Sequence, residues 1–292
     1  MPQTRHVDTD HWPFKLSPLS AVMAAEIRGL DLSRPIDDSL RDAIREAFLK
    51  YHVLCFRDQH LTVEQLVAFS ERFGPLESHI NHEFRGDAIP ELHRVSNLGD
   101  DGQSTSKLKA KGNFHWHTDK SYLPVPSLAT LLHAVELPPD GGATQFADMQ
   151  AAYDALPPDR QAEYAGIRVV HSWEQSRINS GSRPASDQEK RDAPPVVHPL
   201  VRTHPETGRK GLYIGDHSSH IEGRPFAEGR AFLANLQEQA TQDPVVYRHR
   251  WQPGDLIMWD NRSLLHRATA DFDLNRHRRV LHRTVIRGSA PV

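Results

Sequence analysis

The chain has 292 residues, 38% of them hydrophobic and 25% charged, which suits a globular protein large enough to bury a sizeable core. Its 35 basic and 38 acidic residues give a net charge of −3, so there is no basic excess to hold nucleic acid. A single cysteine excludes an internal disulfide and favours a reducing compartment. No signal peptide is visible, and no apolar run approaches the roughly 18–20 residues of a membrane span. We therefore expect a cytoplasmic protein without nucleic-acid or membrane partners.

The first half of the chain is predicted to hold two amphipathic helices, over residues 37–51 and 62–73. The first helix carries apolar side chains at helical spacing behind an acidic start. The second opens with a capping-box pattern, Thr62 followed by Gln65. A short buried strand, residues 51–58, is expected between them, and short extended pieces precede the first helix.

The second half is predicted to alternate between strands and turns, with two more helical stretches. The stretches are residues 151–166 and 225–240, the latter with Phe226, Leu233 and Leu236 on one side. Strand-like segments are residues 127–137, 138–149 with its opening turn, 211–215, 245–251, 255–261 and 278–288.

Many short strands interrupted by long polar segments predict a mainly β fold with flanking helices, a jelly roll of two sheets. Neither an internal repeat nor a domain linker is visible, so residues 1–292 are expected to form one domain. Polar segments near residues 79–112 and 173–195 are expected to form a lid or the walls of a pocket, because such loops often carry binding sites.

A cluster of possible metal ligands occurs in "NFHWHTDKSY", residues 113–122. If His117 and Asp119 lie on one strand, their side chains project to the same face. The pattern alone is weak evidence, since the chain has 19 histidines and His6 with Asp8 repeats it near the start. A third ligand from a distant segment is therefore needed.

His266, in "GDLIMWDNRSLLHRA", follows a predicted strand and a tight Asp-Asn turn and supplies such a ligand. Two histidines and one carboxylate leave three positions of an octahedral ion open, an arrangement that suits non-haem Fe(II). Zinc is more often four-coordinate with a single open position. The sequence therefore predicts an Fe(II) site.

The last predicted strand, "RRVLHRTVIRG", places Arg279 and Arg283 on the same face, roughly 13 Å apart. Arginines that point into an enclosed interior need anions, because an unpaired buried charge costs several kcal/mol. A dicarboxylate cosubstrate and an anionic substrate would supply them. The alternative is an edge strand whose arginines face water.

Together these motifs carry a resemblance to the taurine dioxygenase family of Fe(II)- and 2-oxoglutarate-dependent dioxygenases. The similarity runs in order through about residues 15 to 288 and looks closest to the 2,4-dichlorophenoxyacetate dioxygenase branch across residues 194–267. The family fold, a double-stranded β-helix, agrees with the predicted jelly roll. The segments concerned are "FHWHTDKSY", "PPDGGATQFADMQAAYDALP", "HPLVRTHPETGRKGLYIG", "YRHRWQPGDLIMWDNRSLLHRA" and "RRVLHRTVI".

The resemblance implies that His117, Asp119 and His266 hold Fe(II), with 2-oxoglutarate and O₂ as cosubstrates. It implies that Thr144 and Arg279 hold the distal carboxylate of 2-oxoglutarate. The products are succinate, CO₂ and a hydroxylated substrate, which splits when the hydroxylated carbon bears an ether oxygen or a sulfonate.

On the substrate side, the resemblance implies that Arg283 faces a small organic anion and that Asn113 and His79 line its site. One departure concerns the segment "RATADFDLNRHRR", which is about two residues longer than in those relatives. Arg278 then competes with Arg279 by register, although strand parity with Arg283 favours Arg279. We also expect a homo-oligomer, a dimer or a tetramer.

Several other residues look like ligands but have a structural explanation. His115 lies two residues before His117, yet the matching family position is not a ligand. The "HSSH" motif, residues 217–220, has zinc-like spacing without further ligands nearby and is expected to be a polar loop. His82 competes with His79, and Trp173 is expected in the core.

The substrate and the reaction class leave alternatives open. Within the same family, the substrate is an aryloxyalkanoate such as 2,4-dichlorophenoxyacetate, or else a sulfonate or sulfate ester. Outside it, a jelly-roll hydrolase or isomerase using another divalent metal would work without O₂ and without 2-oxoglutarate. A binding protein that only retains the fold has no use for three open metal positions.

Overall fold

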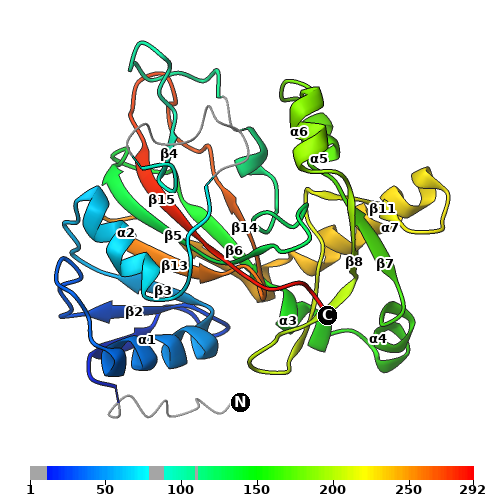
Figure 1. Cartoon of the computed structure of the whole chain (residues 1–292), viewed down its shortest axis with the longest axis horizontal. Coiled ribbons are helices and arrows are strands. Elements are labelled where there is room, and N and C mark those ends of the chain that lie inside the picture. Colours follow the sequence, from blue (N-terminus) through cyan, green and yellow to red (C-terminus); the bar gives the residue numbers. More distant parts are fainter. Residues whose placement is uncertain (1–11, 79–88, 109–110) are drawn as a thin grey trace.

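The computed structural model describes residues 12–78, 89–108 and 111–292. His79, His82 and the His6–Asp8 pair lie outside the described residues. The described chain is mostly β-structure with flanking helices, as predicted (Figure 1). Over those three ranges, no helix combines the length and the apolar character needed to cross a bilayer.

The largest sheet has seven strands in the order β1-β2-β3-β13-β5-β15-β4, antiparallel except for the pair β2 and β3. Strand β4 falls in the polar segment near residues 79–112, where we expected a lid or pocket wall and no strand, because four partly polar residues give too little alternation to indicate one. The strands are Lys15–Pro18 (β1), Ala25–Arg28 (β2), Val53–Phe56 (β3), His93–Ser96 (β4), Ser127–Glu136 (β5), Leu256–Asp260 (β13) and Val280–Arg287 (β15).

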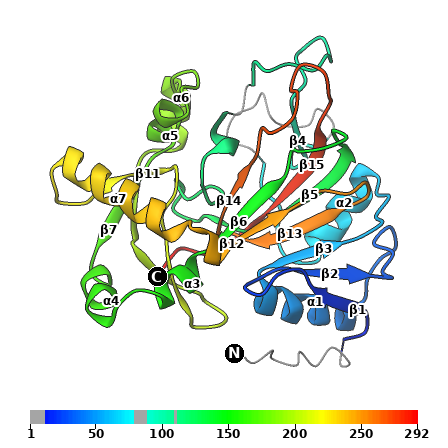
Figure 2. The ribbon, with the colours of Figure 1, turned by 180° about the vertical axis from the view of Figure 1, so that it is seen from behind.

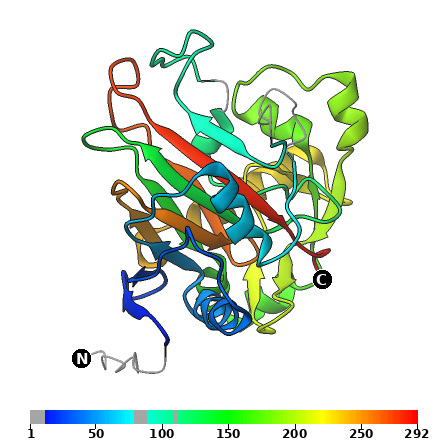
Figure 3. The ribbon, with the colours of Figure 1, turned by 60° about the vertical axis from the view of Figure 1, so that its left-hand side comes forward.

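Helices α1 (Asp38–Tyr51) and α2 (Val63–Glu71) lie against one face of this sheet (Figure 3). Their ends match the predicted signals: Asp37 caps α1, and the capping box of α2 is formed by Thr62 and Gln65. Apolar side chains of both helices, among them Ile44, Phe48 and Leu66, share one core with side chains of the sheet. The sheet contributes Leu54, Leu131 and Met258.

A second sheet of three strands packs over the other face of the large sheet (Figure 2). Its order is β12 (Val246–His249), β6 (Thr144–Asp148) and β14 (Leu264–Ala268). Phe146 and Leu264 from this sheet share a core with residues of the large one. Arg283 of β15, Arg279 directly before that strand and the two histidines among the ligand candidates line one cavity between the two sheets.

Most of the remaining elements lie on the right in Figure 1, beside the two sheets. Residues 173–195, predicted as a polar insertion, fold into two short helices, α5 and α6. On α7, Leu233 and Leu236 are buried as predicted, but Phe226 at the first position is exposed. The elements are β7 (Arg168–His171), β8 (Val196–Pro199), β9 (Val201–Thr203), β10 (Lys210–Leu212), β11 (Ser218–Ile221), α3 (Met149–Asp154), α4 (Pro158–Tyr164), α5 (Trp173–Asn179), α6 (Asp187–Asp192), α7 (Phe226–Ala240) and the 3-10 turns η2 (Lys111–Phe114) and η3 (Asp243–Val245).

Candidate active site

A single antiparallel bridge brings His117 and His266 together from distant parts of the chain. The His117 amide donates to the His266 carbonyl at 3.1 Å, and the reverse hydrogen bond is 2.8 Å long. His266 lies within β14, a strand of its own that begins after the turn following β13. The imidazole centroids are 4.1 Å apart, so the bridge sets both rings side by side.

His117 and Asp119 do not lie on one strand, the arrangement that we considered from the sequence. Pairing ends at the bridge, and Lys120 adopts a left-handed backbone conformation, φ 55°, so the chain turns at residues 119–120. The turn nevertheless delivers the carboxylate: Oδ1 lies 3.9 Å from His117 Nε2, and Oδ2 lies 3.8 Å from His266 Nε2. The three possible ligand atoms lie within 4.8 Å of one another, and all three residues are buried.

The protonation of the two imidazoles fits a metal site. His117 Nδ1 lies 2.8 Å from the His115 carbonyl, which can only accept, so Nδ1 carries the proton and Nε2 presents a lone pair. Burial and the neighbouring His117 depress the pKa of His266 far below its ordinary value, which keeps that ring neutral. Two imidazoles and one carboxylate, all buried, form a donor set that fits Fe(II).

The Asp119 carboxylate is charged despite its burial. Burial alone would favour the neutral acid, but the Arg283 guanidinium and the hydrogen bond from Thr130 hold the pKa of Asp119 well below its usual range. Arg283 Nη2 donates to Oδ1 at 3.0 Å, and the Thr130 hydroxyl donates to Oδ2 at 2.5 Å. Arg283 therefore points into the interior, as predicted, and its partner in this structure is Asp119.

One cavity opens on the His266 side of the cluster, and both Thr144 and Arg279 line it. Arg279 Nε donates to the Gly142 carbonyl at 3.0 Å, whereas its Nη2 is buried without a hydrogen-bond partner among the described residues. Burial lowers the pKa of Arg279 to about 10, an effect that Asp271 only partly opposes. A buried guanidinium with an unused donor beside a cavity fits the distal carboxylate of 2-oxoglutarate.

The absence of a side chain at Gly142 leaves room for the Arg279 side chain. Gly142 has φ +65°, and a Cβ placed on it would meet Arg279 Cδ at 3.1 Å and Nε at 3.2 Å. Arg278, the competing register, points the other way and pairs with Glu136 at 2.8 Å, about half-exposed. The geometry therefore favours Arg279 over Arg278 as the residue that faces the cavity.

A second cavity opens on the Asp119 side, and Asn113 lines both cavities. Most of the charged and aromatic residues that line this second cavity were not predicted individually. Trp173, expected in the core, is buried and also lines it. Lys120 had a visible signal, its position directly after Asp119. Arg177 lies in the segment 173–195 that we expected as a pocket wall, and His217 lies in the "HSSH" motif, but neither residue was itself predicted to line this cavity.

The other candidate ligands are occupied elsewhere. His115 Nδ1 lies 3.0 Å from Asp216 Oδ1, and this hydrogen bond raises the pKa of His115. His217 Nδ1 lies 3.2 Å from the Ser121 hydroxyl. His217 is buried beside the site rather than in a polar loop as predicted, because the "HSSH" motif leads into β11.

Comparisons with known proteins agree with this geometry. Residues 15–285 match the family described as "Taurine catabolism dioxygenase TauD, TfdA family". The alpha-ketoglutarate-dependent 2,4-dichlorophenoxyacetate dioxygenase of Cupriavidus pinatubonensis is 41% identical over 278 residues, 92% of this chain and 96% of that protein. The (S)-phenoxypropionate/alpha-ketoglutarate-dioxygenase of Sphingobium herbicidovorans is 39% identical over 276 residues, 92% of this chain and 93% of that protein.

Among solved structures, AAD-2 in complex with Mn(II) and N-oxalylglycine superposes with a TM-score of 0.86 and 38% sequence identity, covering 95% of this chain and 98% of that one. The fold and the His-Asp-His cluster define an Fe(II)- and 2-oxoglutarate-dependent dioxygenase. Within that class, the chain belongs to the TauD, TfdA family. The resemblance that the motifs predicted is thereby confirmed.

Proposed function

We propose that this enzyme hydroxylates a small organic monoanion, a carboxylate or a sulfonate, at a carbon held beside Fe(II) bound to His117, Asp119 and His266. One observation carries the proposal: a cavity opens on each side of the cluster, and both share His117, Asn113 and Arg283 as lining residues. Two organic molecules can therefore approach one metal from opposite sides. This is what a reaction with a cosubstrate and a substrate requires.

The two cavities are lined by different functional groups. We assign the cavity with Arg279 and Thr144 to 2-oxoglutarate, since the unused Arg279 donor and the Thr144 hydroxyl lie on its wall. The Trp251 indole donates to Thr144 Oγ1 at 3.1 Å, which leaves the Thr144 proton to face a carboxylate. We assign the other cavity to the substrate, with Arg283 and Asn113 as anion and hydrogen-bond contacts. His79 remains a predicted substrate contact.

The balance of charge favours a substrate with one negative charge. Lys120 is neutralised by Glu77, 3.2 Å away and outside the lining residues. As metal ligands the two imidazoles are neutral, and the doubly positive metal cancels the doubly negative cosubstrate. The charged residues that line the two cavities then leave one positive charge. A monoanion balances it, whereas a phosphate monoester would overcompensate. The charged lining residues are the cations Lys120, Arg177, Arg279 and Arg283 and the carboxylates Asp119 and Asp216.

The protein's own contribution to the reaction is to position and to shield. When bound, Fe(II) with 2-oxoglutarate and O₂ supplies the oxidising power to replace a C–H bond by C–OH, with release of succinate and CO₂. Arg279 and Thr144 orient the cosubstrate by its far end. Arg283 orients the substrate by its anion, and the buried ligands exclude water from the reacting atoms.

An aryloxyalkanoate fits the walls of the substrate cavity. Tyr122 and Trp173 both line it, with ring centroids 4.9 Å apart, so an aromatic group has rings to pack against. The two relatives above are named for phenoxyacetate and phenoxypropionate substrates. Hydroxylation of the carbon bearing the ether oxygen gives a hemiacetal, which splits into a phenol and a carbonyl compound. A sulfonate or sulfate ester meets the same charge requirement.

The finer predictions about architecture remain part of this proposal. A double-stranded β-helix is supported by the second sheet packed over the large one. We propose one domain over residues 1–292, with 79–112 and 173–195 as lid or pocket walls; α5 supplies lining residues such as Trp173 and Ser176. A cytoplasmic location is supported by the single, buried Cys55. Light scattering tests the expected dimer or tetramer.

The decisive experiment is spectroscopic. Anaerobic addition of Fe(II) and 2-oxoglutarate to the metal-free protein should produce a weak visible charge-transfer band. Succinate release in air, screened over aryloxyalkanoates, aliphatic carboxylates, sulfonates and sulfate esters, then identifies the substrate class. A hydrolase or isomerase using the same ligands would give no such band and would turn over without O₂, and that result would refute the proposal.

A further inference from the structure

The metal-ligand candidate Asp119 stands at the end of a directed chain of hydrogen bonds. The Trp259 indole donates to Asn261 Oδ1 at 3.0 Å, and the Asp119 amide donates to the same oxygen at 3.3 Å. Both groups can only donate, so this atom of Asn261 must be the oxygen. The amide nitrogen of Asn261 therefore faces the other way, toward Thr130.

The direction continues through the Thr130 hydroxyl. Asn261 Nδ2 donates to Thr130 Oγ1 at 2.9 Å, and Thr130 Oγ1 lies 2.5 Å from Asp119 Oδ2. Because the hydroxyl accepts from Asn261, its single proton is left for the carboxylate. All four side chains are buried, at 4% exposure or less. Water therefore does not compete for these donors. The orientation of the carboxylate is set by the hydrogen bond from Thr130, which Asn261 directs.

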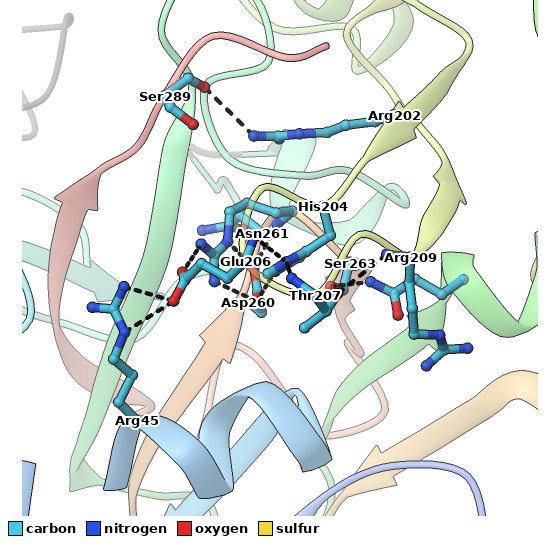
Figure 4. A network of polar contacts seen from close by, with 12 residues as sticks. Arg45, Arg202, His204, Glu206, Thr207, Arg209, Asp260, Asn261, Ser263 and Ser289 are labelled. Carbon is cyan, nitrogen blue, oxygen red and sulfur yellow. Dashed lines mark hydrogen bonds and ion pairs between the residues drawn. The ribbon is translucent and has the colours of Figure 1, made fainter. Parts of the chain in front are cut away.

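The turn that carries Asn261 is itself held by a buried charge network (Figure 4). The Asp260 amide donates to the His52 carbonyl at 2.9 Å, and Asp260 Oδ2 lies 3.0 Å from His204 Nε2. Arg262 donates to both carboxylate oxygens of Asp260 and to Glu206. The backbone at Asn261 is thus fixed, and the Thr118 hydroxyl donates to its carbonyl at 2.7 Å.

We propose that Thr130 and Asn261 are positioning residues that hold Asp119 in its metal-binding orientation independently of Arg283. Arg283 is the other donor to this carboxylate, on Oδ1 at 3.0 Å. In the proposed function, on which this inference rests, Arg283 also binds the substrate anion, so its contact with Asp119 must be able to weaken. The neutral hydroxyl of Thr130 keeps Asp119 in place without reducing its charge.

A matched set of variants tests this role through metal affinity rather than activity. Thr130→Val removes the hydroxyl at nearly constant shape, whereas Thr130→Ser keeps the hydroxyl. Thr284→Val is the control: Thr284 lies in the same sheet as Thr130, and its hydroxyl is equally buried and lies 2.7 Å from the Ser70 hydroxyl of α2. Among the described residues, no hydrogen bond joins it to Asp119. The probe is Mn(II) alone, titrated without oxygen, with free Mn(II) followed by electron paramagnetic resonance. Thermal unfolding of each variant checks the fold.

We expect Thr130→Val to weaken Mn(II) binding by roughly 10- to 100-fold. Thr130→Ser and Thr284→Val should bind as the unmutated protein does. If Thr130→Val does not fold, Thr130→Ala, which removes the same hydroxyl, is measured in its place. Equal Mn(II) affinity in a folded Thr130→Val overturns the inference while leaving the metal site intact. No Mn(II) binding by the unmutated protein contradicts the proposed metal site and this inference together.

Discussion

Two buried clusters in the described residues satisfy the same geometric criterion for a metal site, and only one of them has the chemistry of a site. The first is His117, Asp119 and His266. The second is Cys55, His249 and Asp255, at the other end of the large sheet's central strands β3 and β13. In each, three possible ligand atoms lie within 4.8 Å of one another. The spacing of ligand atoms therefore does not separate them.

In the second cluster, the atoms that could bind a metal are already engaged or protonated. His249 Nε2 is 2.9 Å from Asp255 Oδ2, and its Nδ1 is 3.0 Å from the Tyr247 hydroxyl. Asp255 also accepts two contacts from Arg57 Nη1, at 2.9 and 2.8 Å. Burial raises the pKa of Cys55, so its thiol stays protonated and is a poor ligand. This cluster is a closed, internally neutralised brace of the core.

The first cluster differs in what is unsatisfied around it. Both imidazole Nε2 atoms face the Asp119 carboxylate at 3.8–3.9 Å, too far for hydrogen bonds. Nearby, Arg279 Nη2 and Arg283 Nε are buried without hydrogen-bond partners among the described residues. Cavities adjoin the cluster on both sides. Unused donors and open space, rather than ligand spacing, distinguish a functional cluster from a structural one.

The largest effect is expected from removing the carboxylate of the open cluster. Asp119→Ala should abolish Fe(II)-dependent turnover, because two neutral histidines alone hold Fe(II) poorly. Succinate release with saturating Fe(II) measures it. The matched control is His6→Ala with Asp8→Ala, the same sequence pattern without a third ligand, which should turn over normally. Full activity of Asp119→Ala would remove the distinction between the two clusters.

The next effect concerns the unused donor of Arg279. Arg279→Ala should raise the 2-oxoglutarate concentration needed for half-maximal rate by about 30-fold or more, since a charge-assisted pair is worth about 2–5 kcal/mol. The substrate requirement should change far less. Arg278→Ala is the control, because that side chain pairs with Glu136 at the surface. If Arg278→Ala shows the effect instead, the assignment of Arg279 to the cavity is wrong.

Arg283 has one partner in the open cluster, Asp119, and a proposed second partner in the substrate. Arg283→Gln should keep the iron–2-oxoglutarate band but lose substrate-stimulated turnover by roughly 10²-fold. A neutral ester or amide of the substrate should fail with the unmutated enzyme. If neutral analogues are turned over equally well, Arg283 serves only to brace Asp119, the alternative that its 3.0 Å contact supports.

Much of the fold and of the ligand set was predictable because it rests on local signals. The caps at Asp37 and Thr62 and the alternation that turns Arg279 and Arg283 inward are written in consecutive residues. The turn at Lys120 was not predictable, since only the bridge to His266 limits the extended segment there. Arg177 lies in the segment 173–195 predicted as a pocket wall, but which of its residues line the cavity depends on the packing of α5 and was not predictable.

The smallest effect on activity is expected in the closed cluster, where the consequence is loss of stability. Asp255→Asn keeps the shape but leaves Arg57 with Glu26, 3.0 Å from its Nε, as its remaining carboxylate. Breaking a buried ion pair should lower the free energy of unfolding by about 3 kcal/mol, the lower end of the usual cost. Urea unfolding should show that loss, whereas metal affinity and turnover per folded molecule should stay unchanged.

The same variant has a signature in pH. Burial disfavours the charged form of Asp255, but the hydrogen bond from His249 and further donors outweigh it and lower the pKa of Asp255. A depressed folded-state pKa adds stability that is complete above the unfolded value of about 3.9 and is lost as the pH falls through the folded value. On acidification, Asp255→Asn should therefore lose less stability than the unmutated protein does. A variant that instead loses Mn(II) binding with unchanged stability would make the second cluster part of the metal chemistry and end the contrast.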